Sequence, residues 1–174
     1  MKALVMTGYG GNDVVELREV PKPVAGEDDV LIEVCAASVN PVDFKIRDGK
    51  LRVLLKYRMP LIMGSDLAGI VVAVGGRVIR FKPGDEVFAR VGKLRIGTFA
   101  EYIAVTQDEV ALKPSNLTFE EAASLPLVGL TVYQALVDVA KVQAGQKVFI
   151  PAGSGGVGTF AIQFAKSLGA EVAT

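Results

Sequence analysis

The chain contains 174 residues, of which 51% are hydrophobic, and its 19 basic and 19 acidic side chains give a formal net charge of zero. A hydrophobic content this high supports a buried core and argues against intrinsic disorder. The neutral charge, without any basic run, argues against nucleic acid and anionic membrane surfaces as partners. The longest apolar stretch, around 67–74, is too short to cross a bilayer, so no membrane span is expected.

Histidine is absent from the sequence, and Cys35 is the single cysteine. Ser-His-Asp catalysis, histidine proton transfer and most zinc sites therefore lose their commonest side chain. One cysteine excludes an internal disulfide and fits a reducing compartment, so we expect a cytoplasmic protein. Cys35 falls within a predicted strand, where it is either part of a buried core or a reactive thiol.

Residues 1 to about 115 form a succession of short apolar runs that are separated by glycine and proline. The runs with the composition of strands are Lys2–Met6, Val14–Val20, Val30–Ala37, Gly69–Val74, Glu86–Ala89, Phe99–Ala104 and Val110–Lys113. Their regular spacing, without helical periods, predicts an antiparallel or partly closed β-barrel-like domain. The first run becomes polar at Thr7, which indicates a strand and not a signal peptide.

The hydrophobic period changes after these strands. Thr118 and Glu121 have the spacing of a capping box, which predicts a short helix that ends near Ser124. Pro126 interrupts the helical pattern, and a longer amphipathic helix is predicted over roughly 128–141. One face of this helix is expected to carry Val128, Thr131, Val132, Ala135, Leu136 and Val139. The β-rich region is therefore followed by a region of α/β character.

A glycine-rich segment follows the strand-like run Val148–Ile150 and precedes another helical pattern. Its G-x-G-x-x-G spacing is carried by Gly153, Gly155 and Gly158, and a further strand begins at Glu171. In a β–loop–α–β unit, such glycines allow a tight turn, the close approach of a pyrophosphate, and packing of the helix against the strand. The N–H groups at the start of the helix attract the anion.

This unit predicts a dinucleotide site, although the same glycines also occur in ordinary turns between a strand and a helix. We assign Gly153 to the turn, Gly155 to the close approach and Gly158 to the helix–strand contact. The residues assigned to the pyrophosphate are Gly153, Ser154, Gly155, Gly156, Val157 and Gly158. The predicted apolar face of the helix consists of Val157, Phe160, Ala161, Phe164, Ala165 and Leu168. The side chain that distinguishes NAD from NADP is expected about 20 residues after the first glycine, at or beyond Thr174.

Six segments, in order along the chain, match the signatures of one family. They are Ser38–Asp43, Gly64–Gly69, Phe81–Val87, Gly97–Tyr102, Ala122–Thr131 and Ala152–Gly158. On these segments the chain resembles the zinc-independent quinone oxidoreductases of the medium-chain dehydrogenase/reductase superfamily, including the zeta-crystallin-like and enone or alkenal reductase branch. The resemblance covers the whole chain.

The resemblance implies an α/β protein with a β-rich part. A GroES-like β-barrel-type catalytic domain over 1–120 would be followed, over 121–174, by the start of a Rossmann domain, which is a doubly wound parallel sheet. The rest of that domain would lie after residue 174, so we expect a truncated chain that is inactive alone and a homodimer for the full-length protein. NADP, bound as NADPH, is the implied cofactor, and a quinone or an α,β-unsaturated carbonyl compound is the implied substrate.

Zinc chemistry is the obvious alternative, because zinc-dependent relatives share this architecture. Asn40 and Ser65 occupy the positions where those relatives have cysteine and histidine, and neither is a usual zinc ligand. We therefore expect no metal, and we favour hydride transfer to a quinone or enone, in which the developing charge spreads over the conjugated system. The alternatives are a non-catalytic, crystallin-like NADPH-binding protein and, less favoured, a zinc-dependent alcohol dehydrogenase.

Four further residues are assigned to the site. Asn40 precedes a proline, which keeps it in a turn, and its amide is predicted to donate to the substrate or to the cofactor carboxamide, with an Asx turn as the alternative. Asp43 is assigned to the catalytic site, where it orients a neighbour more readily than it transfers a proton, with a plain turn or cap as the alternative. The resemblance places Lys45 and Thr131 at the cofactor. The alternatives are that Lys45 is a solvated loop residue and that Thr131 serves helix packing.

Overall fold

Two compact units make up the chain. The computed structural model describes all residues, 1–174, and the chain divides into Met1–Ser124 and Leu125–Thr174. The predicted boundary between residues 120 and 121 lies inside helix α2, Phe119–Ala123. None of the helices combines the length and the apolar character that crossing a membrane requires.

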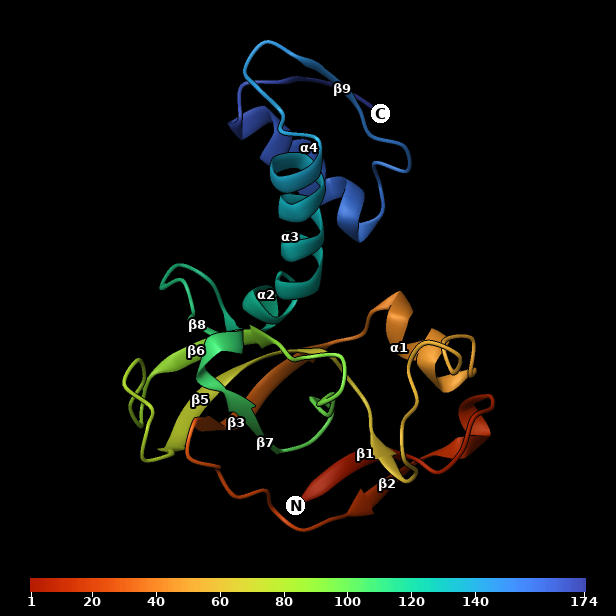
Figure 1. Cartoon of the computed structure of the whole chain (residues 1–174), viewed down its shortest axis with the longest axis vertical. Coiled ribbons are helices and arrows are strands. Elements are labelled where there is room, and N and C mark those ends of the chain that lie inside the picture. The colour runs from red at the N-terminus through yellow and green to blue at the C-terminus, as the bar shows by residue number, and fades with distance from the viewer. The chain divides into compact units, whose positions relative to one another are not determined.

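Antiparallel sheets form most of the first unit, as the spacing of the predicted strands indicates (Figure 1). The larger sheet has the order β7-β3-β5-β6-β8 and consists of Tyr102–Thr106, Asp29–Ser38, Asp66–Val74, Glu86–Arg90 and Val110–Leu112. The smaller sheet has the order β2-β1-β4 and consists of Val15–Glu19, Lys2–Met6 and Leu61–Ile62. The other elements of this unit are α1 (Pro41–Arg47), α2 and the 3-10 turns η1 (Asn12–Val14) and η2 (Gln107–Glu109).

Strand β1 joins the two sheets. A bridge pairs Ala3 with Ala100, just ahead of β7. On either side of this bridge, the N–H of Leu4 donates to the carbonyl oxygen of Phe99 at 2.8 Å, and the N–H of Glu101 donates to that of Lys2 at 3.1 Å. These contacts close part of the gap between the sheets and give the partly closed, barrel-like arrangement that the strand pattern predicts.

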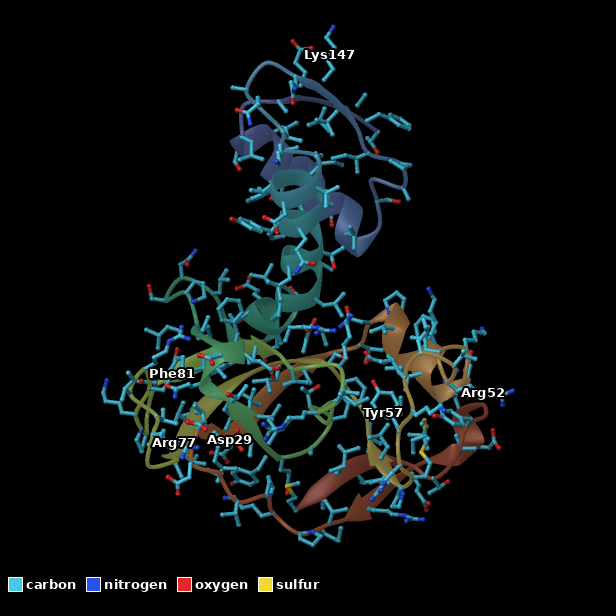
Figure 2. All side chains as sticks on the ribbon, viewed as in Figure 1. Asp29, Arg52, Tyr57, Arg77, Phe81 and Lys147 are labelled. Carbon is cyan, nitrogen blue, oxygen red and sulfur yellow. The ribbon has the colours of Figure 1, made fainter.

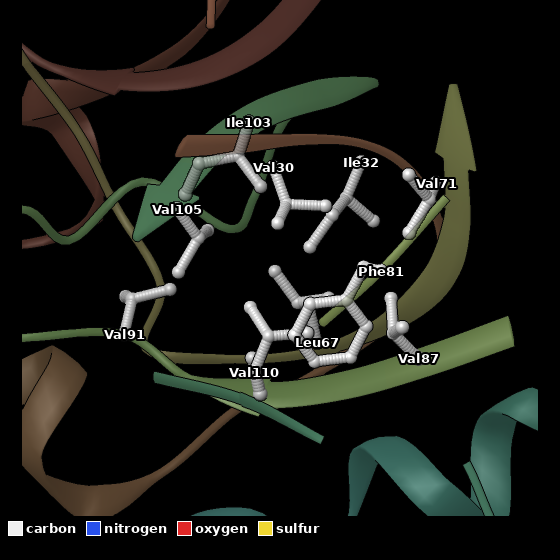
Figure 3. Packing of buried hydrophobic residues seen from close by; sticks show 11 residues of the cluster. Val30, Ile32, Leu67, Val71, Phe81, Val87, Val91, Ile103, Val105 and Val110 are labelled. Atoms are coloured by element: carbon white, nitrogen blue, oxygen red, sulfur yellow. The ribbon is translucent and has the colours of Figure 1, made fainter. Parts of the chain in front are cut away.

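The main core of the first unit lies on the inner face of the larger sheet (Figure 3). Val30 and Ile32 on β3, Leu67 on β5 and Val87 on β6 have no exposed surface. Figure 3 shows the ring of Phe81, from the loop between β5 and β6, lying against these side chains. Inward-facing residues recur every second position along β3, so their burial follows the period of the strand pattern.

A β–α–β unit forms most of the second unit, as predicted. Strands β9, Lys147–Phe149, and β10, Glu171–Ala173, pair in parallel, and helix α4, Gly156–Ser167, connects them. Ala161 and Ala165 of the predicted apolar face are buried. They pack in the small core of this unit.

Helix α3, Pro126–Tyr133, and the π-helical segment η3, Gln134–Val139, occupy the region predicted as one helix over 128–141. Pro126 starts α3 instead of interrupting a helix, because proline is well tolerated in the first turn. Val139 is 80% exposed, which contradicts the predicted apolar face. The wider π turn changes the helical repeat and rotates later side chains away from that face.

The sequence patterns do not predict α1 and β4. In α1, Val42, Phe44 and Ile46 alternate with polar residues in the manner of a strand, and the helix has only seven residues. Strand β4 has two residues, which is too few to produce a pattern. Strand β4 is defined by its pairing with the distant strand β1.

Cys35 is exposed on β3, so the expectation of a buried core position is wrong. The pairing between β3 and β5 shifts between Val34 and Ala36, and Cys35 is the extra residue of this bulge. Partial desolvation, helped by the charge of Glu33, raises the pKa of the thiol. A raised pKa lowers the thiolate fraction and argues against a reactive cysteine.

Paired arginine and aspartate side chains hold the loops at one end of the larger sheet. Arg95 donates to both carboxylate oxygens of Asp29, at 3.1 and 2.9 Å. Arg77 donates to both carboxylate oxygens of Asp28, at 2.9 and 2.6 Å. Figure 2 shows Arg77 and Asp29 at this end of the unit. The hydrogen bonds from Arg95 are the largest cause of a lowered pKa for Asp29.

Candidate functional site

The loop between β9 and α4 contains the glycine motif. The chain leaves β9 through Ile150, whose N–H donates to the carbonyl oxygen of Ala173 at 2.9 Å. The next turn places Ala152 in the left-handed region, with a φ of +57°. The tight turn therefore depends on Ala152, which corrects its assignment to Gly153.

Gly153 and Gly158 lie where any side chain would collide with the protein. A Cβ on Gly158 would lie 2.3 Å from the carbonyl oxygen of Ala152 and 2.8 Å from the Cα of Gly153. A Cβ on Gly153 would lie 2.0 Å from Oγ1 of Thr174. Gly158 thus lets α4 start close against the loop that follows β9, in line with the prediction, and Gly153 lets the end of β10 approach the loop.

The start of α4 is open. Gly155 is the N-cap, no side chain caps the helix, and the first turn has no acidic residue. Val157 is 44% exposed, although the sequence pattern places it on the apolar face. A Cβ on Gly155 would meet only the carbonyl oxygen of Ala152, at 3.4 Å.

This opening has the properties of an anion site. The first N–H groups of a helix have no partners within it, and the helix dipole favours negative charge at this end. Gly155 places no side chain beside these groups, and a Cβ there would meet only the carbonyl oxygen of Ala152. The residues present therefore fit the diphosphate of a dinucleotide.

A second group of predicted site residues lies at the start of α1. Asn40 is the N-cap, with extended backbone, and Pro41 takes the first helical position. The N–H of Asn40 donates to Oδ2 of Asp43 at 2.7 Å. The other oxygen of Asp43 accepts a hydrogen bond from the hydroxyl of Ser65 at 3.1 Å. Asn40 therefore begins a helix, where the sequence pattern predicts a turn.

The side chain of Asn40 is anchored between two strands. Its Nδ2 donates to Oδ2 of Asp66 at 3.0 Å and to Oγ of Ser38 at 3.2 Å. The hydroxyl of Ser38 donates to the same oxygen of Asp66 at 3.3 Å. Ser38 and Asp66 face each other in the register of β3 and β5, so strand pairing brings them together.

Asp43 is 2% exposed, and burial raises its pKa above the ordinary value. Hydrogen bonds from the Asn40 backbone and from Ser65 oppose this shift. Both carboxylate oxygens are occupied by donors of the protein, which is the geometry of a residue that positions its neighbours. Its assignment to the catalytic site stays a prediction.

Nowhere in the chain do three or more histidine, cysteine, aspartate or glutamate side chains gather in a way that could hold a metal ion. Asn40 and Ser65 each form a hydrogen bond to an aspartate. An amide and a hydroxyl in such bonds are poor substitutes for the thiolate and imidazole ligands that zinc prefers.

Lys45 and Thr131 lie in different units. Lys45 is exposed on α1, two residues after Asp43. Thr131 is exposed on α3, and its hydroxyl donates to the carbonyl oxygen of Leu127 at 2.7 Å. Their roles at a cofactor stay predictions.

Sequence reasoning did not identify Ser38 and Asp66 as partners of Asn40. A usable signal exists, since each residue lies just outside a predicted apolar strand, after Val30–Ala37 and before Gly69–Val74. Antiparallel pairing of those two strands places the end of one beside the start of the other. The polar side chains at these ends are therefore expected to meet.

Comparisons with known proteins extend these observations. Residues 26–115 match the family model of the alcohol dehydrogenase GroES-like domain. The chain is 44% identical over 173 residues to the 2-methylene-furan-3-one reductase of Solanum lycopersicum, a match that covers 95% of this chain and 44% of the relative. The chain is also 44% identical to the chloroplastic NADPH-dependent alkenal/one oxidoreductase of Arabidopsis thaliana, and this match covers 95% of this chain and 44% of that relative.

Solved structures show the same similarity. The crystal structure of the Escherichia coli quinone oxidoreductase complexed with NADPH matches this chain with a TM-score of 0.88 at 30% identity. The match covers 99% of this chain and 51% of that chain. The chain thus spans about half the length of the relatives that it matches.

Proposed function

This chain belongs to the family of alcohol dehydrogenase GroES-like domains, and from this premise we propose that the whole protein is a zinc-independent oxidoreductase. It uses NADPH to reduce a quinone or the conjugated double bond of an α,β-unsaturated carbonyl compound. Relatives named as an NADPH-dependent alkenal/one oxidoreductase and as a quinone oxidoreductase complexed with NADPH support this proposal. The observation that carries it is the open, uncapped start of α4 at the glycine motif.

In this proposal the glycine loop holds the diphosphate of NADPH. The backbone N–H groups at the start of α4 face the anion, and the lack of a side chain at Gly155 permits close approach. Lys45 and Thr131 are further contacts to the cofactor. The residues of the loop are Gly153, Ser154, Gly155, Gly156, Val157 and Gly158.

The polar cluster at α1 supports the chemistry. When bound, NADPH supplies a hydride to the electrophilic carbon of the substrate. Negative charge then develops on the carbonyl oxygen of the substrate, and a positioned hydrogen-bond donor stabilises that charge. Asn40 is the proposed donor, to this oxygen or to the cofactor carboxamide, and Asp43 fixes its backbone.

A matched pair of substitutions at Gly155 tests the proposed anion site. Gly155→Asn and Gly155→Asp both introduce a good N-cap residue of the same size into an extended backbone position, so both should preserve α4. Only aspartate adds a negative charge in front of the helix. We expect Gly155→Asp to weaken NADPH binding at least about tenfold relative to Gly155→Asn, measured by calorimetry on the full-length native protein. Equal affinities for the two variants would contradict the assignment.

The reaction itself is tested by following NADPH absorbance with a panel of quinones and enones. Oxidation of NADPH with at least one substrate is expected, and Asn40→Ala should reduce the rate. Binding of NADPH without turnover on any compound would favour the non-catalytic alternative. Stoichiometric zinc in the purified protein would favour the alcohol dehydrogenase alternative.

Homodimerisation and a cytoplasmic location stay predictions for the whole protein. The Arabidopsis relative is named as chloroplastic, so the family is not confined to the cytoplasm.

A further inference from the structure

The buried side chain of Asp66 has no role in the function proposed so far. We propose that Asp66 is a positioning residue that accepts a hydrogen bond from one N–H of the Asn40 carboxamide and thereby directs the other N–H bond toward a ligand. The first half of this inference concerns the protein alone, and the second half rests on the proposed function of Asn40.

The distances around the Asn40 amide lead to this conclusion. Nδ2, Oδ2 of Asp66 and Oγ of Ser38 form a triangle with sides of 3.0, 3.2 and 3.3 Å. Seen from Nδ2, the two acceptors therefore subtend roughly 60°, whereas the two N–H bonds of an amide diverge by about 120°. When one N–H bond points at the charged acceptor, Oδ2 of Asp66, the second N–H bond lies roughly 55° or more from the direction of Ser38 and leaves the triangle.

Asp66 determines which end of the amide faces inward. A carboxylate accepts hydrogen bonds, so it attracts the NH₂ group of Asn40 and repels the carbonyl oxygen. Asp66 is fully buried at the start of β5, where pairing with Ser38 on β3 fixes its place. Rotation of the amide by 180° would set its carbonyl oxygen against the carboxylate.

Asp43 and Asp66 thus hold different parts of Asn40. Asp43 accepts from the backbone N–H of Asn40, and Ser65 ties Asp43 to the start of β5. Asp66 accepts from the side chain of Asn40. The backbone N–H of Asn40 is therefore held by Asp43 and the NH₂ group of its carboxamide by Asp66, so a change at residue 66 should disturb the carboxamide and leave the hydrogen bond from the Asn40 backbone to Asp43 in place.

The side-chain amide of Asn40 gives a direct test, because the chain has only three asparagines, Asn12, Asn40 and Asn116. NMR spectra of the wild-type chain labelled with ¹⁵N-asparagine resolve the two Hδ2 protons of each one. Only one Hδ2 of Asn40 should show a nuclear Overhauser effect to the β protons of Ser38 and Asp66. Equal effects for both protons, or none for either, would overturn the proposal without any variant.

Substitutions then test the role of the charge. Asp66→Asn should shift the Asn40 amide resonances and leave those of Asn12 and Asn116 in place. Asp108→Asn is the control, since Asp108 is 86% exposed in the η2 turn, and it should shift none of the three. Unchanged Asn40 resonances in Asp66→Asn would overturn the proposal.

Exchanging the side chains of residues 40 and 66 separates the effect of their hydrogen bond on stability from its effect on the reaction. In Asn40→Asp/Asp66→Asn, donor and acceptor are reversed, so the hydrogen bond returns but position 40 has no N–H to offer. We expect the double variant to unfold at a higher temperature than Asp66→Asn. In the full-length protein both should lose roughly 10- to 100-fold in kcat/KM for quinone or enone reduction.

The outcomes distinguish the two proposals. Recovery of kcat/KM together with stability in the double variant would overturn the role of Asp66 in orienting a donor. A wild-type protein that reduces no quinone or enone rejects the proposed function alone, since the NMR result still decides whether Asp66 holds the amide. A double variant no more stable than Asp66→Asn would overturn the pairing.

Discussion

Gly158→Ala is expected to separate α4 from the loop that precedes it. The new Cβ would lie 2.3 Å from the carbonyl oxygen of Ala152 and 3.0 Å from its carbonyl carbon. These are backbone atoms, so no side chain can rotate away, and the helix has to shift outward. Such overpacking costs about 1–3 kcal/mol. The better helix propensity of alanine returns at most about 1 kcal/mol.

The net expectation is a loss of about 1–2 kcal/mol in the free energy of unfolding. Gly156→Ala is the matched control, because it lies in the same helical turn and its Cβ would meet only Val128, at an ordinary 3.6 Å. Urea unfolding followed by far-UV circular dichroism measures the difference, and hydrogen exchange of α4 amides localises it. If Gly158→Ala unfolds at the same urea concentration as Gly156→Ala, the close contact with Ala152 does not constrain this helix.

Two further substitutions test the first unit. Arg95→Ala should lower the free energy of unfolding at pH 7 by about 0.5–1 kcal/mol, because it removes the paired hydrogen bonds to Asp29. The folded state lowers the pKa of Asp29, so this contribution is present above the unfolded-state pKa, near 4, and is lost as the pH falls through the folded-state value. In urea titrations, the difference in the free energy of unfolding between wild type and variant should therefore be smaller at acid pH than at neutral pH. The same difference at both pH values would contradict a stabilising ion pair. Gly64→Ala should be more destabilising than Gly84→Ala in thermal unfolding. Both glycines have positive φ, of +99° and +92°, but only at Gly64 would the Cβ collide, 2.3 Å from Oγ1 of Thr98. Equal losses of stability in the two variants would show that backbone strain, and not the collision, causes the destabilisation.

The sequence was sufficient for most of the strands and for the cap of α2, because these depend on neighbours along the chain. The predicted strand Lys2–Met6 is β1. The reciprocal hydrogen bonds between Thr118 and Glu121 form as the capping box predicts, at 2.9 and 3.2 Å. The α/β fold class with a GroES-like, β-rich part is confirmed as well.

Features set by long-range pairing were not predictable in the same way. The bulge at Cys35 depends on where β3 slips against β5, and the strand pattern of β3 carries no sign of it. The left-handed residue of the glycine loop is Ala152, where the motif suggests Gly153. α1 was recoverable in principle, since Asn40, Pro41 and Asp43 are an N-cap, a first-turn proline and an acid in the first turn.

The close approach of Gly153 and Thr174 links the glycine loop to the residue that follows β10. Thr174 lies against the loop, with its hydroxyl 2.0 Å from where a Cβ of Gly153 would be. A larger residue introduced at position 174 to alter the choice between NADH and NADPH would press on the loop itself. Under the proposed function, affinity for both nucleotides should then fall together, and compensating changes in the loop would have to accompany any switch of preference.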